Sequence, residues 1–283
     1  MLRKLAHCLM CLILLLSLLA SINSCKRPSL RMATTTSLYE TGLWGYLEPM
    51  FEGKYGLGLD ILSLGSGAAF EYARRGDVDV ITTHDRANEL KLIADGYGVE
   101  RVPFAYNYFL IVGPANDPAG IKGLSPEEAF KKLTETGKGG FVSRGDNSGT
   151  HAKEKAVWTA AGFDYETVRK AGEWYVEAGQ GMGATLLMTS EKQAYTLTDM
   201  GTYLSYKSKL ELVPIVDKGA ILLNVYSVIA VNPQKVATLK NFDMANKLIS
   251  FLTSPEIQEF IGNYGVKECG SPLFIPCAGA EPK

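Results

Sequence analysis

Short apolar runs alternate with amphipathic segments along the chain from Leu30 onward. Apolar runs of four to eight residues between turn residues predict buried strands, and apolar residues that recur every three or four positions predict helices. The alternation is typical of an α/β protein built from βα units on a mostly parallel sheet. The predicted strands are Leu30–Thr34, Leu59–Leu64, Asp77–Thr82, Tyr106–Val112, Gly140–Ser143, Tyr175–Ala178, Ala194–Leu197, Glu211–Val216 and Ile221–Val231.

The helices follow these strands. Ser37 and Glu40 have the spacing of a capping box, and apolar residues continue from Leu43 to Phe51, so one helix is expected from Ser37 to about Gly53. The other predicted helices are Ala68–Arg75, Asn88–Ala94, Pro126–Thr134, Ser148–Ala161, Gly183–Ser190, Thr202–Tyr206, Phe242–Leu252 and Pro255–Tyr264.

Two of the strands are unusually long and apolar, Tyr106–Val112 and Ile221–Val231, and they bracket a block of about 110 residues. We interpret them as crossovers between two Rossmann-like lobes with a cleft between them. Ligands of open α/β sheets lie at the carboxyl ends of strands, so the cleft is the expected binding site. The predicted organisation is residues 25–112 for the first part of lobe 1, 113–222 for lobe 2, and 223–283 for the return segment and C-terminal tail of lobe 1.

Composition narrows the functional classes. The 283 residues include 29 Lys and Arg, 30 Asp and Glu, and 46% hydrophobic residues, which excludes a disordered chain, a collagen and a coiled coil. The formal charge of −1 and the absence of Lys/Arg clusters argue against a nucleic-acid partner, because binding to phosphate backbones requires many cationic contacts.

The N-terminus has the three parts of an export signal. Arg3 and Lys4 form a short basic region, Leu9–Ala20 is almost wholly apolar, and small or polar residues lead to Cys25. We therefore expect residues 1–24 to be removed and the mature protein to act outside the cytoplasm. The segment that ends in Cys25 resembles a bacterial lipobox, which implies a lipid anchor on this cysteine; cleavage nearby by an ordinary signal peptidase is the alternative.

Cysteine and histidine content bears on disulfides and metals. Cys269 and Cys277 remain as an even pair in an oxidising compartment, which favours a disulfide across a small C-terminal loop. His84 and His151 have no ligand partner at helical or hairpin spacing, so neither a metal cation nor any cofactor is expected.

Two strand-to-helix turns in the first part of the chain carry hydroxyl groups. Thr35, Thr36 and Ser37 follow the first strand, and Ser66 lies between two glycines after the second. Helix starts present unpaired N–H groups and the positive end of the helix dipole, which suit an oxyanion. The alternative is that these residues serve only as helix caps.

A third turn, Ser143–Thr150, adds a fixed cation. Arg144 can donate two parallel hydrogen bonds to an oxyanion, and Ser148, Gly149 and Thr150 open the next helix. The alternatives are an Arg144–Asp146 pair on a solvated loop and an Arg-Gly-Asp adhesion motif.

The fourth turn, Gly179–Thr185, has three glycines in five residues, which lets the backbone approach a ligand; Gly183 and Ala184 are the candidates that line the cleft. Its spacing is not that of a dinucleotide-binding loop, and packing glycines are the alternative. Four such turns, two from each lobe, would face one another across the cleft.

The sequence contains no recognisable catalytic motif. We find no nucleophile elbow, no Walker loop and no metal-ligand cluster, and Ser148 with His151 has no obvious orienting acid. A non-enzymatic binding protein is therefore expected.

At Ala33–Ser37, Ser143–Thr150 and Glu177–Leu186 the sequence resembles the TupA family, the tungstate-binding proteins of bacterial ABC transporters. The resemblance covers nearly the whole mature chain. The remaining similar stretches are Asp77–Val80, Tyr97–Gly98, Ile111–Pro114, Asp117–Gly123, Ala194–Asp199 and Ala230–Pro233.

The resemblance implies a type II periplasmic-binding-protein fold, in a monomer that closes on one tungstate or molybdate ion and delivers it to a membrane permease. It implies Arg144 as the principal charge partner, with Thr150, Thr36 and Ser37 as donors. Ser66 stands where the family often has Thr, and it keeps the hydroxyl. His84 departs from the family pattern in the residue before it, so it either lines the cleft or caps the strand.

The choice among tetrahedral anions is left open by the sequence. Phosphate near neutral pH carries an O–H that needs an acceptor, whereas tungstate and molybdate need only donors. A cleft-facing Asp146 would favour a phosphate-binding protein of the same fold, and an Asp146 that holds Arg144 or caps the helix would favour tungstate. An adhesin or structural lipoprotein, with no response to small anions, is the third possibility.

Overall fold

The computed structural model describes residues 27–282. The export signal and the lipid-anchor prediction at Cys25 lie outside these residues. Within the described part of the chain, no helix is both long and apolar enough to cross a membrane.

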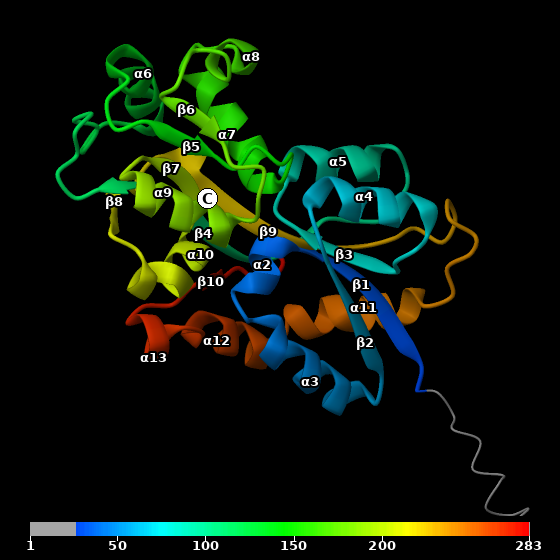
Figure 1. The fold of residues 1–283 in the computed structure, drawn as a ribbon. Helices are drawn as coiled ribbons and strands as arrows, with labels where there is room; N and C mark the ends of the chain where they lie inside the picture. The colour runs from blue at the N-terminus through cyan, green and yellow to red at the C-terminus, as the bar shows by residue number, and fades with distance from the viewer. Residues whose placement is uncertain (1–26, 283) are drawn as a thin grey trace, which may run out of the picture.

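The chain forms two α/β lobes that are connected through two long strands, β4 and β9 (Figure 1). In the first lobe, β1 lies between β2 and β3, parallel to both, and the sheet continues in the order β10-β4-β9-β3-β1-β2. In the second lobe, β5 and β6 pair in parallel, and β7 and β8 pair antiparallel with the far half of β4. The strands are β1 (Ser29–Thr35), β2 (Gly58–Leu64), β3 (Val80–Thr83), β4 (Val102–Pro114), β5 (Phe141–Ser143), β6 (Tyr175–Glu177), β7 (Thr196–Asp199), β8 (Leu212–Val216), β9 (Leu223–Ala230) and β10 (Ile275–Pro276).

Helices cover both lobes. Those of the first lobe are α2 (Thr36–Glu40), α3 (Trp44–Tyr55), α4 (Ser66–Arg75), α5 (Arg86–Ala94), α11 (Phe242–Leu252), α12 (Pro255–Asn263) and α13 (Val266–Cys269). Those of the second lobe are α6 (Pro126–Thr136), α7 (Gly149–Ala160), α8 (Tyr165–Val168), α9 (Met182–Lys192) and α10 (Met200–Tyr206). Single turns of 3₁₀ helix follow at Lys207–Lys209 and Ala220–Leu222.

The long strand β4 belongs to both lobes. Its first half pairs with β9 and β10, and its second half, from Phe109 on, pairs with β7 and β8. The strand runs two residues beyond its predicted end at Val112, because Gly113 and Pro114 pair with β8. A side chain at position 113 would meet the ring of Tyr195 at 2.3 Å, so glycine is needed there for close packing.

The pairing of β4 and β9 also corrects the prediction of a mostly parallel sheet. β1, β2 and β3 are parallel, but β9 runs antiparallel to both β3 and β4. Hydropathy along the chain identifies buried strands but carries no information on their relative direction.

Each lobe has its own hydrophobic core. Trp44 and Phe51 of α3 pack with Phe251 of α11 beneath the first sheet. Trp158 of α7 packs on Phe130 of α6 in the second lobe, with ring centroids 4.2 Å apart. Because the cores are separate, the lobes behave as two packed bodies joined by β4 and β9.

The first predicted helix is broken in the structure. Gly42 adopts φ +78° between α2 and α3, a left-handed conformation that ends α2. The N-cap is Thr35, whose Oγ1 accepts from the Leu38 backbone N–H at 3.4 Å, and not Ser37 as the capping-box spacing suggested. Ser37 therefore lies inside α2, and its hydroxyl turns toward another element of the fold.

The two C-terminal cysteines are free thiols in the structure, in contrast to the expected disulfide. Cys269 ends α13 and packs against the core of the first lobe, whereas Cys277 follows β10, which lies extended along β4. The antiparallel pairing of Ile275 and Pro276 with β4 ties the end of the intervening segment to the sheet instead of letting the segment close into a loop on Cys269.

Candidate anion-binding site

The four hydroxyl- and glycine-rich turns come from both lobes, and three of them are joined by hydrogen bonds. The turns before α2 and α4 belong to the first lobe, and those before α7 and α9 to the second. Arg144 Nη2 donates to Thr36 Oγ1 at 3.0 Å, and the Gly149 N–H donates to Ser66 Oγ at 3.1 Å. These two hydrogen bonds span the lobes, so the structure has the lobes in contact at the ends of β1, β2 and β5.

Arg144 is the cation of the site and is only 3% exposed. Its Nε donates to Asp146 Oδ2 at 2.8 Å, while Asp146 Oδ1 accepts from the Ser148 backbone N–H at 3.1 Å. Both carboxylate oxygens of Asp146 are therefore used by its own loop. The Arg144–Asp146 pair that was the alternative interpretation does form, but around a buried guanidinium instead of on a solvated loop. A guanidinium has five N–H groups, so donors remain for a ligand.

The start of α7 presents three predicted residues. Ser148 is the N-cap, and its Oγ accepts from the His151 backbone N–H at 3.3 Å. Thr150 is 1% exposed, and its Oγ1 has no hydrogen-bond partner among the residues that the structure describes. Because an unpaired buried hydroxyl costs about 1–3 kcal/mol, this hydroxyl is a donor that a ligand would satisfy.

Gly149 packs tightly at the junction of the lobes. A Cβ at this position would lie 3.0 Å from His84 Cε1 and 3.1 Å from Ser66 Oγ. Glycine lets the backbone of α7 reach the first lobe, which is why its N–H can bond to Ser66.

The predicted residues of the first lobe have different partners. Thr35 is the helix cap described above, and its Oγ1 lies 3.4 Å from Ser37 Oγ. Ser37 is buried, and its Oγ lies 3.1 Å from His84 Nε2. His84 thus contacts the predicted donors, and its place directly after β3, at the carboxyl end of a strand, was the available signal for it.

The turn before α9 departs from the expectation. Gly183 is buried, and a Cβ there would meet Tyr206 Oη at 2.3 Å, so this glycine is required for packing; Ala184 is exposed. The Gly183 N–H bonds to the carboxyl of Glu40, from α2 of the opposite lobe. Desolvation raises the pKa of Glu40, and the nearby charge of Arg144 opposes this rise. Sequence reasoning treated Glu40 only as a capping residue and missed this position.

A buried carboxyl braces the Arg144 loop from behind. Ser143 Oγ donates to Glu154 Oε2 at 2.7 Å and accepts from the Gly145 N–H at 3.1 Å. Trp158 Nε1 and the Tyr175 hydroxyl donate to Glu154 Oε1 at 3.0 and 2.6 Å. Desolvation in this core raises the pKa of Glu154 to about 7.

His151 braces the same loop from its other end. The Asn147 N–H donates to His151 Nδ1 at 2.9 Å, and Nε2 lies 2.6 Å from the Tyr165 hydroxyl, which donates to Glu177 at 2.7 Å. Burial lowers the pKa of His151 to about 4, so the ring is neutral at physiological pH. Ser148 Oγ accepts from the backbone N–H of His151, whereas the ring nitrogens of His151 bond to Asn147 and Tyr165, so the two side chains do not pair.

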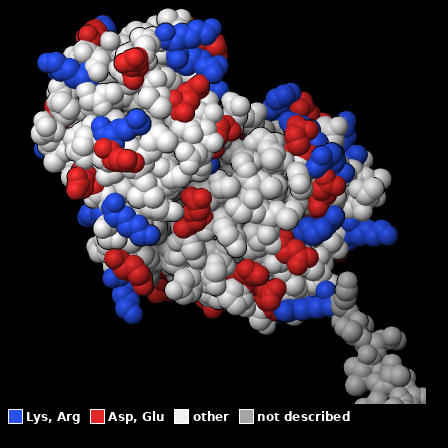
Figure 2. Space-filling model, in the orientation of Figure 1, with Lys and Arg blue, Asp and Glu red and all other residues white. Residues whose placement is uncertain are grey.

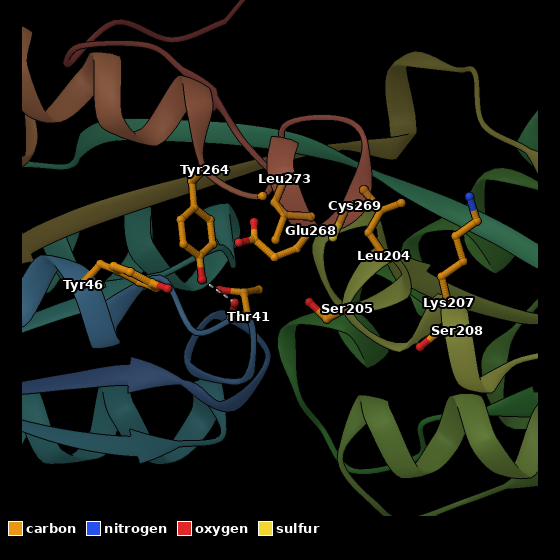
Figure 3. Close-up of a pocket in the computed structure, with 11 residues that line it drawn as sticks. Thr41, Tyr46, Leu204, Ser205, Lys207, Ser208, Tyr264, Glu268, Cys269 and Leu273 are labelled. Atoms are coloured by element: carbon orange, nitrogen blue, oxygen red, sulfur yellow. Dashed lines mark hydrogen bonds between the residues drawn. The ribbon is translucent and has the colours of Figure 1, made fainter.

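Two cavities flank the contact between the lobes. One, of about 480 Å³, is lined by His84, Gly149 and Lys153 among others. The other, of about 670 Å³, lies between the aromatic rings of Tyr46 and Tyr264 on one side and Lys207 on the other (Figure 3), and none of the predicted site residues lines it.

Charge on the molecule is mixed. On the face shown in Figure 2, basic and acidic groups are interspersed over both lobes. Among residues 27–282 no group of three or more His, Cys, Asp or Glu is placed to hold a metal ion.

Comparison with known proteins gives one consistent result. Residues 21–256 match the family model of the PBP superfamily domain. The tungstate-binding protein TupA of Peptoclostridium acidaminophilum is 44% identical over 255 residues, which span 89% of this chain and 87% of that protein.

Solved structures agree. The tungstate-binding protein TupA of Desulfovibrio alaskensis is 39% identical with a TM-score of 0.76, covering 88% of this chain and 99% of that one. The tungstate ABC transporter structure from Geobacter sulfurreducens is 47% identical with a TM-score of 0.73, covering 83% and 98%. These matches confirm the predicted two-lobe α/β fold of a periplasmic binding protein.

Proposed function

The chain belongs to the PBP superfamily and, within it, to the TupA family, and from this premise we propose that it captures tungstate between its two lobes for an ABC transporter. In this proposal Arg144 supplies the charge. The neutral donors are the hydroxyls of Thr36, Ser37, Ser66, Ser148 and Thr150 and the backbone at Gly149.

The observation that carries the proposal is the orientation of Asp146. A carboxylate facing the ligand would accept the O–H of a protonated phosphate and repel a bare dianion. Here each of its oxygens accepts a hydrogen bond from its own loop, one from Arg144 and one from the Ser148 N–H, so the carboxylate holds Arg144 and the start of α7. A set of donors without an acceptor matches tungstate or molybdate, whose four oxygens carry no proton, better than phosphate.

The buried hydroxyl of Thr150 supports the same conclusion. It lies at the start of a helix and has no partner in the described part of the chain. The N–H groups of a helix start and an uncommitted hydroxyl together favour an anion over a neutral ligand.

Delivery and location complete the proposal. Closure of the lobes over the anion would create the surface that a permease recognises. In this proposal the protein works outside the cytoplasm and as a monomer. Lipid modification of Cys25 would keep it at the membrane, and no catalytic step is involved.

The decisive experiment is calorimetric titration of the purified protein with tungstate, molybdate, phosphate and sulfate in a buffer free of other oxyanions. We expect tight binding of tungstate and weak binding of phosphate. Preference for phosphate would identify the chain as a phosphate-binding protein. Binding of none of the four anions would favour the alternative of an adhesin or structural lipoprotein.

Thr150→Val sharpens this experiment. The change removes an unpartnered hydroxyl at nearly constant volume, so tungstate affinity should fall about fivefold to tenfold while the free protein becomes no less stable. Thr189→Val is the matched control, because Thr189 Oγ1 donates to the Thr185 carbonyl at 2.7 Å. The control should lose stability and retain affinity; the opposite pattern would remove Thr150 from the site.

A further inference from the structure

A chain of three amide and ring groups fixes the hydrogen positions of His84. Asn107 Nδ2 donates to the Leu273 carbonyl at 3.2 Å, so Asn107 Oδ1 is its acceptor end. Asn224 Nδ2 donates to that oxygen at 2.9 Å, which leaves Asn224 Oδ1 toward His84 Nδ1 at 2.9 Å. An amide oxygen can only accept, so His84 Nδ1 carries the hydrogen.

The other ring nitrogen then faces Ser37. When the ring is neutral, Nε2 has a lone pair and must receive the Ser37 O–H across the 3.1 Å contact. The ring is buried, and this burial lowers the pKa of His84 below its usual 6.5. While the ring is neutral, Ser37 therefore gives its only hydrogen to His84 and can only accept from other groups, among them the Thr35 hydroxyl at 3.4 Å.

We propose that His84 is a specificity-determining residue that takes up one proton when a fully deprotonated oxyanion binds, and thereby converts Ser37 from an acceptor into a donor. The inference rests on the proposed function. In the imidazolium, Nδ1–H still donates to Asn224 Oδ1, and Nε2–H donates to Ser37 Oγ. The Ser37 O–H is then released toward the ligand, and the added proton comes from solvent.

The surroundings of His84 make this uptake feasible. The rings of Tyr226 and Phe109 lie 5.2 and 6.1 Å from it. The charged or titratable groups around it are Asp85, the N-cap of α5, Glu89 of α5, Asp199 before α10, Tyr226 of β9, and Arg86 and Lys153, which line the same cavity as His84. The acids raise the pKa of His84 and so oppose the lowering that burial causes. A bound dianion would raise this pKa further. The 480 Å³ cavity brings solvent to the ring.

The same arrangement explains selection between anions. With a neutral His84, Ser37 can accept from a ligand that carries its own O–H. With a charged His84, Ser37 donates its own O–H and therefore suits a ligand that has no O–H. Since the bound state has the higher His84 pKa, affinity for the dianion should rise as pH falls through the window between the bound and the free pKa, by at most about tenfold per pH unit.

Proton uptake can be counted directly. Titration of the purified protein with tungstate near pH 7, in buffers of different ionisation enthalpy, gives the number of protons taken up for each anion. We expect a net uptake of up to about one proton, largest at pH values between the free and the bound pKa of His84. His84→Gln, which cannot titrate, should bind with no uptake, whereas Glu48→Gln, which removes a titratable group on α3 outside the site, should retain it.

Two further measurements keep the inference open to refutation if a variant fails to fold. In the parent protein, nuclear magnetic resonance of the His84 ring should change from a neutral to an imidazolium signature on addition of tungstate. Asn224→Asp places a carboxylate against Nδ1, which raises the pKa of His84 in the free protein and should shrink the uptake at neutral pH.

The outcomes separate the two proposals. Tight tungstate binding without proton uptake, or with an unchanged ring signature, would overturn the role of His84 and leave the transport function standing. Absence of tungstate binding would instead overturn the proposed function itself.

Discussion

The two lobes contribute unlike halves to one site. The second lobe supplies a buried cation, Arg144, on a loop that is braced from behind by Glu154 and His151. The first lobe supplies neutral hydroxyls at helix starts, and one of them, Ser37, is held through His84. One half is built around a braced cation, and the other consists mainly of hydroxyl groups that can change their hydrogen positions.

The difference separates two tasks of a binding site. A cation fixed in a low-dielectric loop attracts any oxyanion strongly, because it does not need to reorganise. Hydroxyl groups both donate and accept, so they can discriminate between anions that differ by one proton. We therefore expect changes in the second lobe to alter affinity for all oxyanions and changes in the first lobe to alter the preference among them.

The largest expected effect comes from removing the cation. Arg144→Ala should weaken tungstate binding about 100-fold or more, because charged hydrogen bonds are lost and the Asp146 carboxylate is left unpaired. Calorimetry measures this change, and Arg75→Ala, an exposed arginine paired with Asp77, is the control that should bind normally. Equal affinity in the Arg144 variant would remove the second lobe from the site.

The contact between the halves can be tested with Gly149→Ala. The new methyl group would press on the His84 ring and on Ser66 Oγ, so the lobes could not approach fully, and affinity should drop about tenfold. Alanine favours a helix, so thermal stability should not fall. Gly67→Ala is the control, since a Cβ there meets nothing within 4 Å; a matching loss in both variants would refute the steric explanation.

Glu154, which braces the Arg144 loop, should make the stability of the protein depend on pH. The pKa of Glu154 is raised to about 7 from an ordinary 4.5, so the folded state favours its protonated form. Its contribution is therefore fully present below about pH 4.5 and is lost as pH rises to about 7, by at most about 3 kcal/mol. Glu154→Gln should flatten this decline in melting curves recorded across that range, and an unchanged pH profile would contradict the assignment.

The smallest expected effect is at the rim of the first lobe. Glu40→Gln removes a negative charge near Arg144 and the Gly183 N–H, so tungstate affinity should rise a few-fold, more at low salt than at high salt. Glu48→Gln on α3, whose acidic neighbours are Glu52 and Asp60, is the matched control and should leave affinity unchanged. A lower affinity in the Glu40 variant would mean that this carboxyl holds the lobes together instead of repelling the anion.

Several features of the site could be found from local sequence because they depend on neighbours in the chain. Hydroxyls and glycines directly after apolar runs predicted helix starts at strand ends, and the structure has α2, α4 and α7 beginning there. The capping residue was predicted wrongly, since Thr35 and Ser37 are both good caps and only the break at Gly42 and the contact with His84 distinguish them.

The amino-acid sequence by itself determined the residue types, the order of elements and the family, because these follow from periodicity and from the residues at each turn. Only the tertiary structure decided what those residues do. The hydrogen bonds that orient Asn107, Asn224 and His84 join positions more than 100 residues apart, and so does the bond between Arg144 and Thr36. Whether a hydroxyl donates or accepts depends on such partners. Residues so far apart in the chain come together only because β4 and β9 pair and join the two lobes.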